Sequence, residues 1–510
     1  MKNEENLFFF CISLVISYLC TQKIIMAEKT LKEKTATGLL WGAVNNISMQ
    51  VLMALIGIAL GRLLSPAEYG MTGMLAIFAA IAGSLQESGF IAAITNLKQA
   101  THREYNAVFW FSTSVSLLLY ALLYLAAPLI ASFFHEPELV GLSRLVFASF
   151  VVAGIGTAHS AYMFRNMMNR EKAIMNMVAL LCSGVVGITL AYNGYSYWSL
   201  AWQQFTYICL IDVGRLYYVR WLPTLHIDMT PIREMFGFSS KLLITNIINQ
   251  VNGNLLSLVF GRLYSAKALG NYTQAMKWNA MGYSFVSGTI QQVAQPVLAS
   301  VNDEEGRQVN VFRKMLRFTA FLSMPAMLGL ALVADFIVVL LGDKWTDSVP
   351  LLRLLCVSGA FIPIHTLYQN LFISHGRSNT YMWCTIAQVA AQLGIVMAFS
   401  TFGIETMVTA YATMLILWTG VWQVLARQLI DLRIADVLKD ILPFLLSAAA
   451  CIAIAYFTTR SITQPVVLII VRIAITALLY VAIMKVANVK IFNECIQYLF
   501  KRHETTPGEN

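Results

Sequence analysis

Long apolar stretches recur along the chain, and they constrain its fold more than any other feature of the sequence. From Thr37 onward, segments long enough to cross a bilayer follow one another with short loops between them. Because a membrane helix needs about 20 mostly apolar residues, the pattern predicts an all-α polytopic membrane protein. We expect fourteen spans, near 38–61, 71–95, 107–130, 142–164, 173–192, 197–217, 238–261, 271–299, 316–341, 350–373, 380–401, 405–426, 441–459 and 465–485.

The scarcity of charge agrees with this class. Only 12% of the 510 residues are charged and 58% are apolar, whereas a soluble protein carries about 25% charged residues. The net charge of +9 indicates topology rather than nucleic-acid binding, because Lys and Arg are retained on the cytoplasmic side. From residue 29 on, 23 of them fall in the leader, the predicted inner loops and the tail, against 7 outside. We therefore expect both termini in the cytoplasm.

The first 25 residues do not fit the pattern. The run Leu7–Cys20 is short for a span, and no A-x-A cleavage site follows it. Met26 opens a polar, Lys-rich leader over 26–37. We interpret 1–25 as an extension upstream of the true start, with an extra marginal helix as the alternative.

An internal repeat sets the domain organisation. The segment 46–70 matches 246–270 without a gap, with ten identical positions of 25, among them the polar pairs Asn46/Asn246 and Gln50/Gln250 and a shared G-R-L-x-S exit. Six spans separate the copies, so both run in the same direction and predict two six-helix lobes in a parallel repeat. The expected parts are the N-lobe with its inner loop (38–235), the C-lobe (236–430), two further spans (431–486) and a cytoplasmic tail (487–510).

Polar side chains inside spans are costly, so those present are expected to face an interior. They gather on the first helix of each lobe, and amides offer donors and acceptors without charge, as sugar hydroxyls require. Hydrogen bonding between helices is the structural alternative for any single amide. The candidates for cavity lining are Asn46, Gln50, Asn246, Asn249, Gln250 and Asn254.

Aromatic and cationic residues extend this hypothesis. Trp278 and Tyr283 could stack on sugar rings, although aromatic belts at the membrane interface are a common reason for such residues. Lys241 and Lys277 are candidates for an anionic group such as pyrophosphate, with snorkelling to the headgroups as the alternative. Arg62 and Arg262 end the duplicated helices and could hold phosphate at an outer mouth, or could interact with the helix dipoles.

No catalytic template is present: the sequence has no Walker A loop, and no H-E-x-x-H, G-x-S-x-G or G-x-G-x-x-G stands in a suitable context. The eight cysteines are scattered and form no C-x-x-C pair. We expect neither an enzyme nor a cofactor or metal site. Glu87, a carboxylate inside the second span, is the candidate for H⁺ or Na⁺ coupling, with a structural hydrogen bond as the alternative.

The fourteen-span pattern, the GRLLSPAEYG exit and the loop NDEEGRQVNVFRKMLRF before Pro325 resemble the bacterial polysaccharide transporters of the multidrug/oligosaccharidyl-lipid/polysaccharide flippase superfamily, especially its Wzx-type, colanic-acid-exporter-like branch. The resemblance covers roughly 30–490. It implies a multi-pass flippase of the bacterial inner membrane that moves undecaprenyl-pyrophosphate-linked oligosaccharide units of exopolysaccharide, O-antigen or capsule type, by alternating access, toward a glycan polymerase.

Two other functions stay open on the sequence alone. A drug/cation antiporter of the same superfamily would be expected to have twelve helices and an acid in its first helix, which this chain lacks. A membrane-embedded glycan polymerase or ligase would need a large outer loop, and the predicted outer loops are short. We expect a monomer whose partners are the lipid-linked substrate, the bilayer, and the polymerase and glycosyltransferases of its pathway, without nucleic acid.

Overall fold

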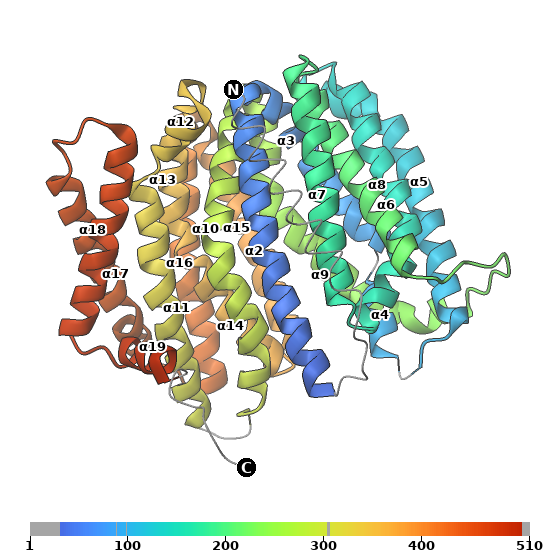
Figure 1. The fold of residues 1–510 in the computed structure, drawn as a ribbon. Helices are drawn as coiled ribbons and strands as arrows, with labels where there is room; N and C mark the ends of the chain where they lie inside the picture. Colours follow the sequence, from blue (N-terminus) through green and yellow to red (C-terminus); the bar gives the residue numbers. More distant parts are fainter. Residues whose placement is uncertain (1–30, 88, 98, 303–305, 502–510) are drawn as a thin grey trace, which may run out of the picture.

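The computed structural model describes residues 31–87, 89–97, 99–302 and 306–501, and within them the regular structure is helical (Figure 1). The helices are α2 (Leu31–Leu63), α3 (Pro66–Glu87), α4 (Phe90–Asn96), α5 (His102–Phe134), α6 (Leu139–Arg165), α7 (Asn169–Tyr192), α8 (Trp198–Tyr218), α9 (Thr230–Leu263), α10 (Ala266–Ala299), α11 (Arg307–Leu332), α12 (Phe336–Leu341), α13 (Ser348–Gly359), α14 (Ile362–Ser374), α15 (Ser378–Phe399), α16 (Ile404–Ile430), α17 (Ile434–Thr458), α18 (Pro465–Val486) and α19 (Lys490–Lys501).

Among the described residues, eleven helical segments are long and apolar enough to cross a membrane. The chain is therefore an all-helical polytopic membrane protein. Of the fourteen expected spans, the three that miss this standard are α8, α9 and α10, with 21, 34 and 34 residues. Their length is sufficient, so it is their amides, hydroxyls and charges that set them apart.

Some expected spans are interrupted. The second divides into α3 and α4 around Gly89, whose φ of 70° lies in the left-handed region that favours glycine. The tenth divides into α13 and α14, and Pro363 stands in the first turn of α14, where its missing N–H costs nothing. Pro325 and Pro443 lie inside α11 and α17. The expected boundary at 235/236 falls within α9, which continues without a break from Thr230.

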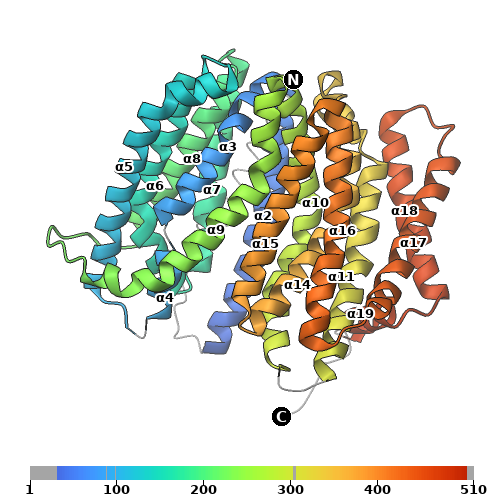
Figure 2. The same cartoon turned by 180° about the vertical axis from the view of Figure 1, so that it is seen from behind.

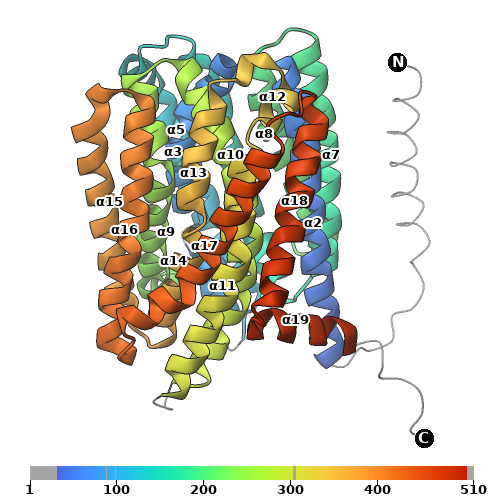
Figure 3. The ribbon, with the colours of Figure 1, turned by 90° about the vertical axis from the view of Figure 1, so that its left-hand side faces the viewer.

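The helices form two groups with a smaller pair outside (Figure 2). One group holds α5, α6, α7 and α8, the other holds α11 and α13 to α16, and α17 and α18 stand beyond it. Helix α9 starts along the lower edge, near α4 and α5, and then rises beside α15. Figure 3 shows α19 lying across the lower end of the bundle, within the expected tail 487–510.

The two groups meet where α3 crosses α10. A β-carbon on Gly70 would overlap the carbonyl oxygen of Ala266, and one on Gly270 would overlap the carbonyl oxygen of Pro66. Both pairs are related by the 200-residue offset of the sequence repeat. The glycines let the two backbones touch, because neither position carries a side chain.

At the upper end of Figure 1, where α2 finishes, Lys344 and Trp345 of the segment after α12 bond to the last turn of α2; this segment, 343–345, is called the plug below. The indole Nε1 of Trp345 donates to the carbonyl of Gly61 at 2.8 Å, and Lys344 Nζ donates to the carbonyl of Arg62 at 2.8 Å. Trp345 has no exposed surface, and its ring meets Tyr69 edge-on at 5.2 Å. These bonds satisfy carbonyls that the end of a helix leaves free. They also attach the end of α2 to the segment that follows α12.

At the lower end, ion pairs join α17 and α19 to α11. Arg313 makes two hydrogen bonds to the buried carboxylate of Asp440, at 2.7 and 3.2 Å, and lies 3.2 Å from Asp436. Lys314 pairs with Glu494 of α19 at 2.6 Å. The last helices are thus anchored to the bundle through neighbouring residues of α11.

Candidate functional site

A pocket of about 340 Å³, lined by apolar as well as polar side chains and called the polar pocket below, lies where α2, α3, α7, α8 and α10 meet. Its polar groups are the amides of Gln203 and Gln204, the phenols of Tyr69 and Tyr207, and the hydroxyls of Thr72 and Ser183. The hydroxyls of Thr72 and Ser183 donate to backbone carbonyls. The two amides and the Tyr207 phenol have no hydrogen-bond partner among the described residues, so they are free to bind a ligand.

Lys277 is the cation of this pocket. It belongs to α10, yet its ammonium lies against Gly57 of α2, where a β-carbon would collide with it. No carboxylate of the described part of the chain pairs with it. Helix α10 packs on α13 and α14 of the second group. The structure therefore places a lysine of α10 among the side chains of α2, α3, α7 and α8.

The six amides predicted to line a cavity lie on α2 and α9, below this pocket, and are called the amide stripe from here on. Asn46, Asn246 and Asn249 are exposed. Gln50 is also exposed, and its amide lies 3.4 Å from Ser284 Oγ of α10, while Asn249 accepts from the Tyr381 hydroxyl of α15 at 3.3 Å. These contacts join neighbouring helices, and the exposed amide atoms remain available to a ligand.

The other amides of the stripe are less accessible. Asn254 donates to the carbonyl of Gln250 at 2.9 Å within α9, so its side chain is satisfied locally. Gln250 is half-buried. The side chain of Lys241 lies outside the described part of the structure.

Trp278 and Tyr283 are half-buried against the core, and Trp278 meets Phe336 of α12 edge-on with ring centroids 4.9 Å apart. Its indole nitrogen has no hydrogen-bond partner. Neither residue lines the polar pocket. The structure thus separates Trp278 and Tyr283 from Lys277, although all three belong to α10.

The two arginines of the repeated exit are engaged by different protein groups. Arg62 Nε donates to the carbonyl of Leu340 at 2.6 Å. Arg262 Nη1 lies 2.5 Å from His135 Nδ1, and its guanidinium stands 5.2 Å from the Phe133 ring centre. A phosphate at this end would compete with those contacts.

Glu87 ends α3 with an exposed side chain. The preceding Gln86 is buried and donates to Thr157 Oγ1 at 2.5 Å and to the carbonyl of Ala153 at 3.2 Å. The nearby buried carboxylate of Asp212 is paired with Arg215 at 2.6 Å. Gln86 thus makes the buried hydrogen bonds at this end of α3, while Glu87 lies near the cationic side chains of Arg215 and Lys172.

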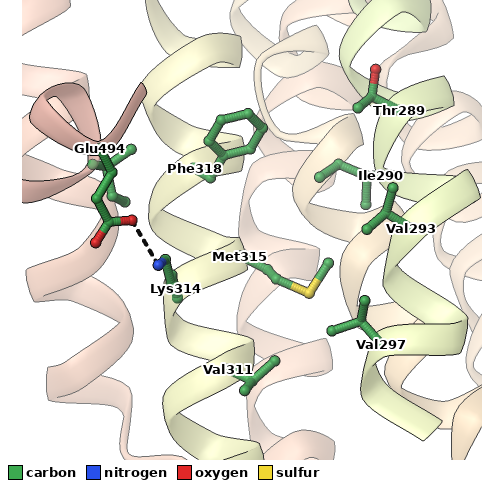
Figure 4. Close-up of a pocket in the computed structure, with 10 residues that line it drawn as sticks. Thr289, Ile290, Val293, Val297, Val311, Lys314, Met315, Phe318 and Glu494 are labelled. Atoms are coloured by element: carbon green, nitrogen blue, oxygen red, sulfur yellow. Dashed lines mark ion pairs between the residues drawn. The ribbon is translucent and has the colours of Figure 1, made fainter. Parts of the chain in front are cut away.

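A second pocket, of about 760 Å³, is almost entirely apolar (Figure 4). Figure 4 shows Val293 and Val297 of α10 facing Val311 and Met315 of α11, with the Lys314–Glu494 ion pair at one edge. It lies in the lower half of the bundle, where α19 crosses below. Its lining suits a hydrocarbon chain.

Sequence reasoning missed the contribution of α8. Gln203, Gln204 and Tyr207 lie outside the repeated segment, among aromatic residues typical of an interface belt. Their spacing of three and four residues, which puts Gln203 and Tyr207 on one helix face, was the signal that could have revealed them. Within the described residues no group of three or more His, Cys, Asp or Glu side chains could hold a metal ion.

The glycine crossing and most of the residues that line the polar pocket lie within the part of the chain that a family model recognises. The model described as polysaccharide biosynthesis protein matches residues 59–350, more than half of the chain. The chain belongs to this polysaccharide biosynthesis protein family. The family is a Wzx-like branch of the multidrug/oligosaccharidyl-lipid/polysaccharide superfamily of transporters, so the resemblance read from the sequence is confirmed.

Relatives in two bacteria support the membership. The chain is 24% identical to the teichuronic acid biosynthesis protein TuaB of Bacillus subtilis, over 82% of this chain and 88% of TuaB. It is 25% identical to the lipopolysaccharide biosynthesis protein WzxC of Escherichia coli, over 76% of this chain and 82% of WzxC. The family proteins thus match most of the helical bundle.

The fold is also found in a solved structure. The lipid II flippase MurJ, in an inward closed conformation, superposes with a TM-score of 0.74 over 91% of this chain and 99% of MurJ, at 14% sequence identity. At that identity the likeness establishes the fold alone. The family member described here therefore has a MurJ-like helical architecture.

Proposed function

We propose that this protein flips undecaprenyl-pyrophosphate-linked oligosaccharide repeat units of exopolysaccharide, O-antigen or capsule type across the bacterial inner membrane. The observation that carries the proposal is the polar pocket, which takes side chains from both helical groups directly below the Gly70/Gly270 crossing. A ligand held there touches both groups at once. Rocking of one group against the other would then expose it to the opposite side, which is alternating access.

Fourteen spans in two lobes and a C-terminal pair form the architecture of this transporter. The N-lobe comprises α2 to α8, the C-lobe α9 to α16, and α17 and α18 follow. The polarity of α8, α9 and α10 supports counting them as spans, because helices that line a hydrated cavity can carry amides and charges at membrane depth. The reciprocal contacts of Gly70 and Gly270 support a two-fold axis between the lobes.

The lower end of Figure 1 faces the cytoplasm in this proposal. The support is the excess of Lys and Arg in the loops and the tail at that end. The tight contacts of Gly270, Trp345 and Leu60 then close the periplasmic side, while the exposed amides of Asn46 and Asn246 lie toward the cytoplasmic side. The described state would thus receive a substrate from inside.

The two pockets would hold different parts of an amphipathic substrate. The apolar pocket of α10 and α11 accepts part of the prenyl chain, and the polar pocket and amide stripe accept the sugar hydroxyls. Arg62 and Arg262 remain candidates for the pyrophosphate as it leaves. Such a carrier forms and breaks no covalent bond, so we propose no enzymatic activity.

Glu87 is proposed as the coupling site. Its exposed carboxylate stands at the cytoplasmic end of α3, the helix that carries Gly70 at its other end. Binding of H⁺ or Na⁺ there could bias the crossing between its two arrangements. Glu87→Gln should reduce the response of transport to the ion gradient more than transport without a gradient.

Deletion of the gene in its own host tests the proposal. Lipid-linked oligosaccharide should accumulate in the cytoplasmic leaflet, shown by its resistance in intact cells to an externally added glycosidase, and the wild-type gene should restore sensitivity. Unchanged leaflet distribution would refute flipping, and hypersensitivity to cationic drugs in its place would favour an antiporter. Loss of polymer with normal outer-leaflet units would indicate a polymerase.

A further inference from the structure

We infer that the polar pocket recognises an acidic sugar residue, with the carboxylate of that residue on the ammonium of Lys277. This inference rests on the proposed function and specifies its substrate class: repeat units that contain a uronate or a similar carboxylate-bearing sugar. The pocket is at the small end of ligand sites, which begin at about 300 Å³, so it fits one sugar unit rather than a whole repeat.

The charge of the pocket selects the class of ligand. Among its lining residues the charged group is Lys277, and no acid accompanies it. A single cation compensates one carboxylate. A pyrophosphate carries more charge and is typically held by several cations or by the forked guanidinium of arginine, and the pocket offers neither.

The neutral groups suit the rest of a sugar ring. Gln203 and Gln204 each supply amide donors and an acceptor, and Tyr207 adds a hydroxyl and an apolar ring face. Because none of these three polar ends is bonded within the described structure, a ligand would not have to displace protein contacts.

The same geometry makes recognition dependent on the transport state. Lys277 comes from α10 of the C-lobe, whereas Gln203, Gln204 and Tyr207 come from α8 of the N-lobe. The ammonium enters the N-lobe because Gly57 leaves room for it. An acidic sugar therefore bridges the lobes while the Gly70/Gly270 crossing is closed, and it loses one side of its site when the lobes separate.

Paired substrates test the inference in cells that lack their own flippase. One strain makes a repeat unit with a glucuronate residue, and the other makes the same unit with glucose at that position. For each strain the fraction of units in the outer leaflet is measured, and the ratio of acidic to neutral flipping is compared between variants. Lys277→Gln should lower this ratio about tenfold, as expected for loss of a charge-assisted hydrogen bond, and Lys277→Arg should lower it less.

The outcomes are distinguishable. If the wild type flips neither unit, the proposed function fails. If it flips both and Lys277→Gln leaves the ratio unchanged, including an equal loss of both units as a pyrophosphate contact would give, the acidic-sugar inference fails. Lys267→Gln is the matched control, because Lys267 lies on the same helix, is exposed and pairs with Asp347 at 2.9 Å, away from the pocket.

A second measurement does not depend on transport. Purified full-length protein is treated with an amine-reactive reagent, and modification of Lys277 is followed by mass spectrometry. Trigalacturonate should protect Lys277, whereas maltotriose and inorganic pyrophosphate at equal concentration and ionic strength should not. Protection by pyrophosphate alone, or by no ligand, would overturn the inference, and Gly57→Ala should weaken protection by displacing the ammonium.

Discussion

Gly70 and Gly270 lie against each other at the crossing of α3 and α10: a β-carbon on Gly270 would stand 3.1 Å from the backbone nitrogen of Gly70. The two residues occupy equivalent places in the sequence repeat. Because neither residue has a side chain, α3 and α10 approach closely there. A movement of one helix against the other would therefore change this contact directly.

The first prediction concerns this crossing. Gly70→Ala or Gly270→Ala should hold the lobes apart, at a cost of about 1–3 kcal/mol to the closed state, as for other overpacked contacts. A cysteine at Thr72, in the polar pocket, should then become several-fold more reactive toward an impermeant maleimide added outside.

Alanine at Gly83 of α3 and at Gly288 of α10 provides the controls, since nothing lies within 4 Å of a β-carbon at either position. Labelling that rises equally in the control variants would mean that helix stability, not the crossing, governs access.

The second prediction concerns the plug. Trp345→Ala removes a fully buried ring and the hydrogen bond to the carbonyl of Gly61, and should cost about 3–5 kcal/mol. Trp345→Phe keeps most of the packing and loses only the hydrogen bond, about 1 kcal/mol. Thermal unfolding of the detergent-solubilised protein should rank the two in this order, and equal midpoints would show that the plug does not hold the upper end.

The third prediction tests the amide stripe. Asn246→Ala combined with Gln250→Ala should reduce flipping several-fold without changing membrane insertion, because the variant loses two amides that we propose to contact the substrate. Asn254→Ala is the control, since that amide already bonds within its own helix. Full transport in the double variant would contradict the assignment of the stripe to the substrate path.

The fourth prediction concerns the anchor of α17. Arg313→Ala removes both hydrogen bonds to the buried Asp440 carboxylate and leaves it only the more distant Arg317, at 3.8 Å, which should destabilise the fold by about 2–3 kcal/mol. Asp440→Asn combined with Arg313→Gln should cost clearly less, because no lone charge stays buried. A double-variant cycle in denaturant measures the difference, and additive losses would mean that the pair is not coupled.

The fifth prediction concerns the segment that joins the lobes. Its Asp228 has a pKa lowered to about 2, mainly by hydrogen bonds from Thr230 and then by Arg103 at 2.6 Å. Because the pKa in the folded protein lies below the ordinary value, the stabilising contribution is complete above about pH 4 and disappears as the pH falls toward 2. Limited proteolysis of residues 219–229 should therefore be constant from pH 5 to 8. Asp228→Asn should raise it across that range, and equal cleavage of both proteins would show that the ion pair does not hold the segment.

The sequence predicted the helices well because apolar length and short loops are local properties. The repeat is visible in the sequence itself, because its polar identities at Asn46 and Gln50 exceed what two apolar helices share by composition. The break at Gly89 and the division between α13 and α14 were missed, since isolated Gly and Pro residues are common in membrane helices.

The site was predicted only in part, because a pocket depends on which helix faces meet. Lys277 could be singled out as a charge inside a span, but Gly57 and Gln203 become its neighbours only through the packing of α2 and α8. Trp278, one residue further along, points to Phe336 instead. The position of a residue along one helix therefore does not predict whether its side chain lines a pocket that five helices form together.

The most direct test of flipping is reconstitution of the purified protein in vesicles that carry lipid-linked oligosaccharide with a fluorescent sugar label in both leaflets. Dithionite added outside quenches the outer leaflet at once, and flipping brings the inner molecules out to be quenched. Vesicles with the wild-type protein should approach complete quenching, and those with Gly270→Ala should approach it several-fold more slowly, while protein-free vesicles stop near half. Equal quenching with and without the wild-type protein would contradict its assignment as a flippase.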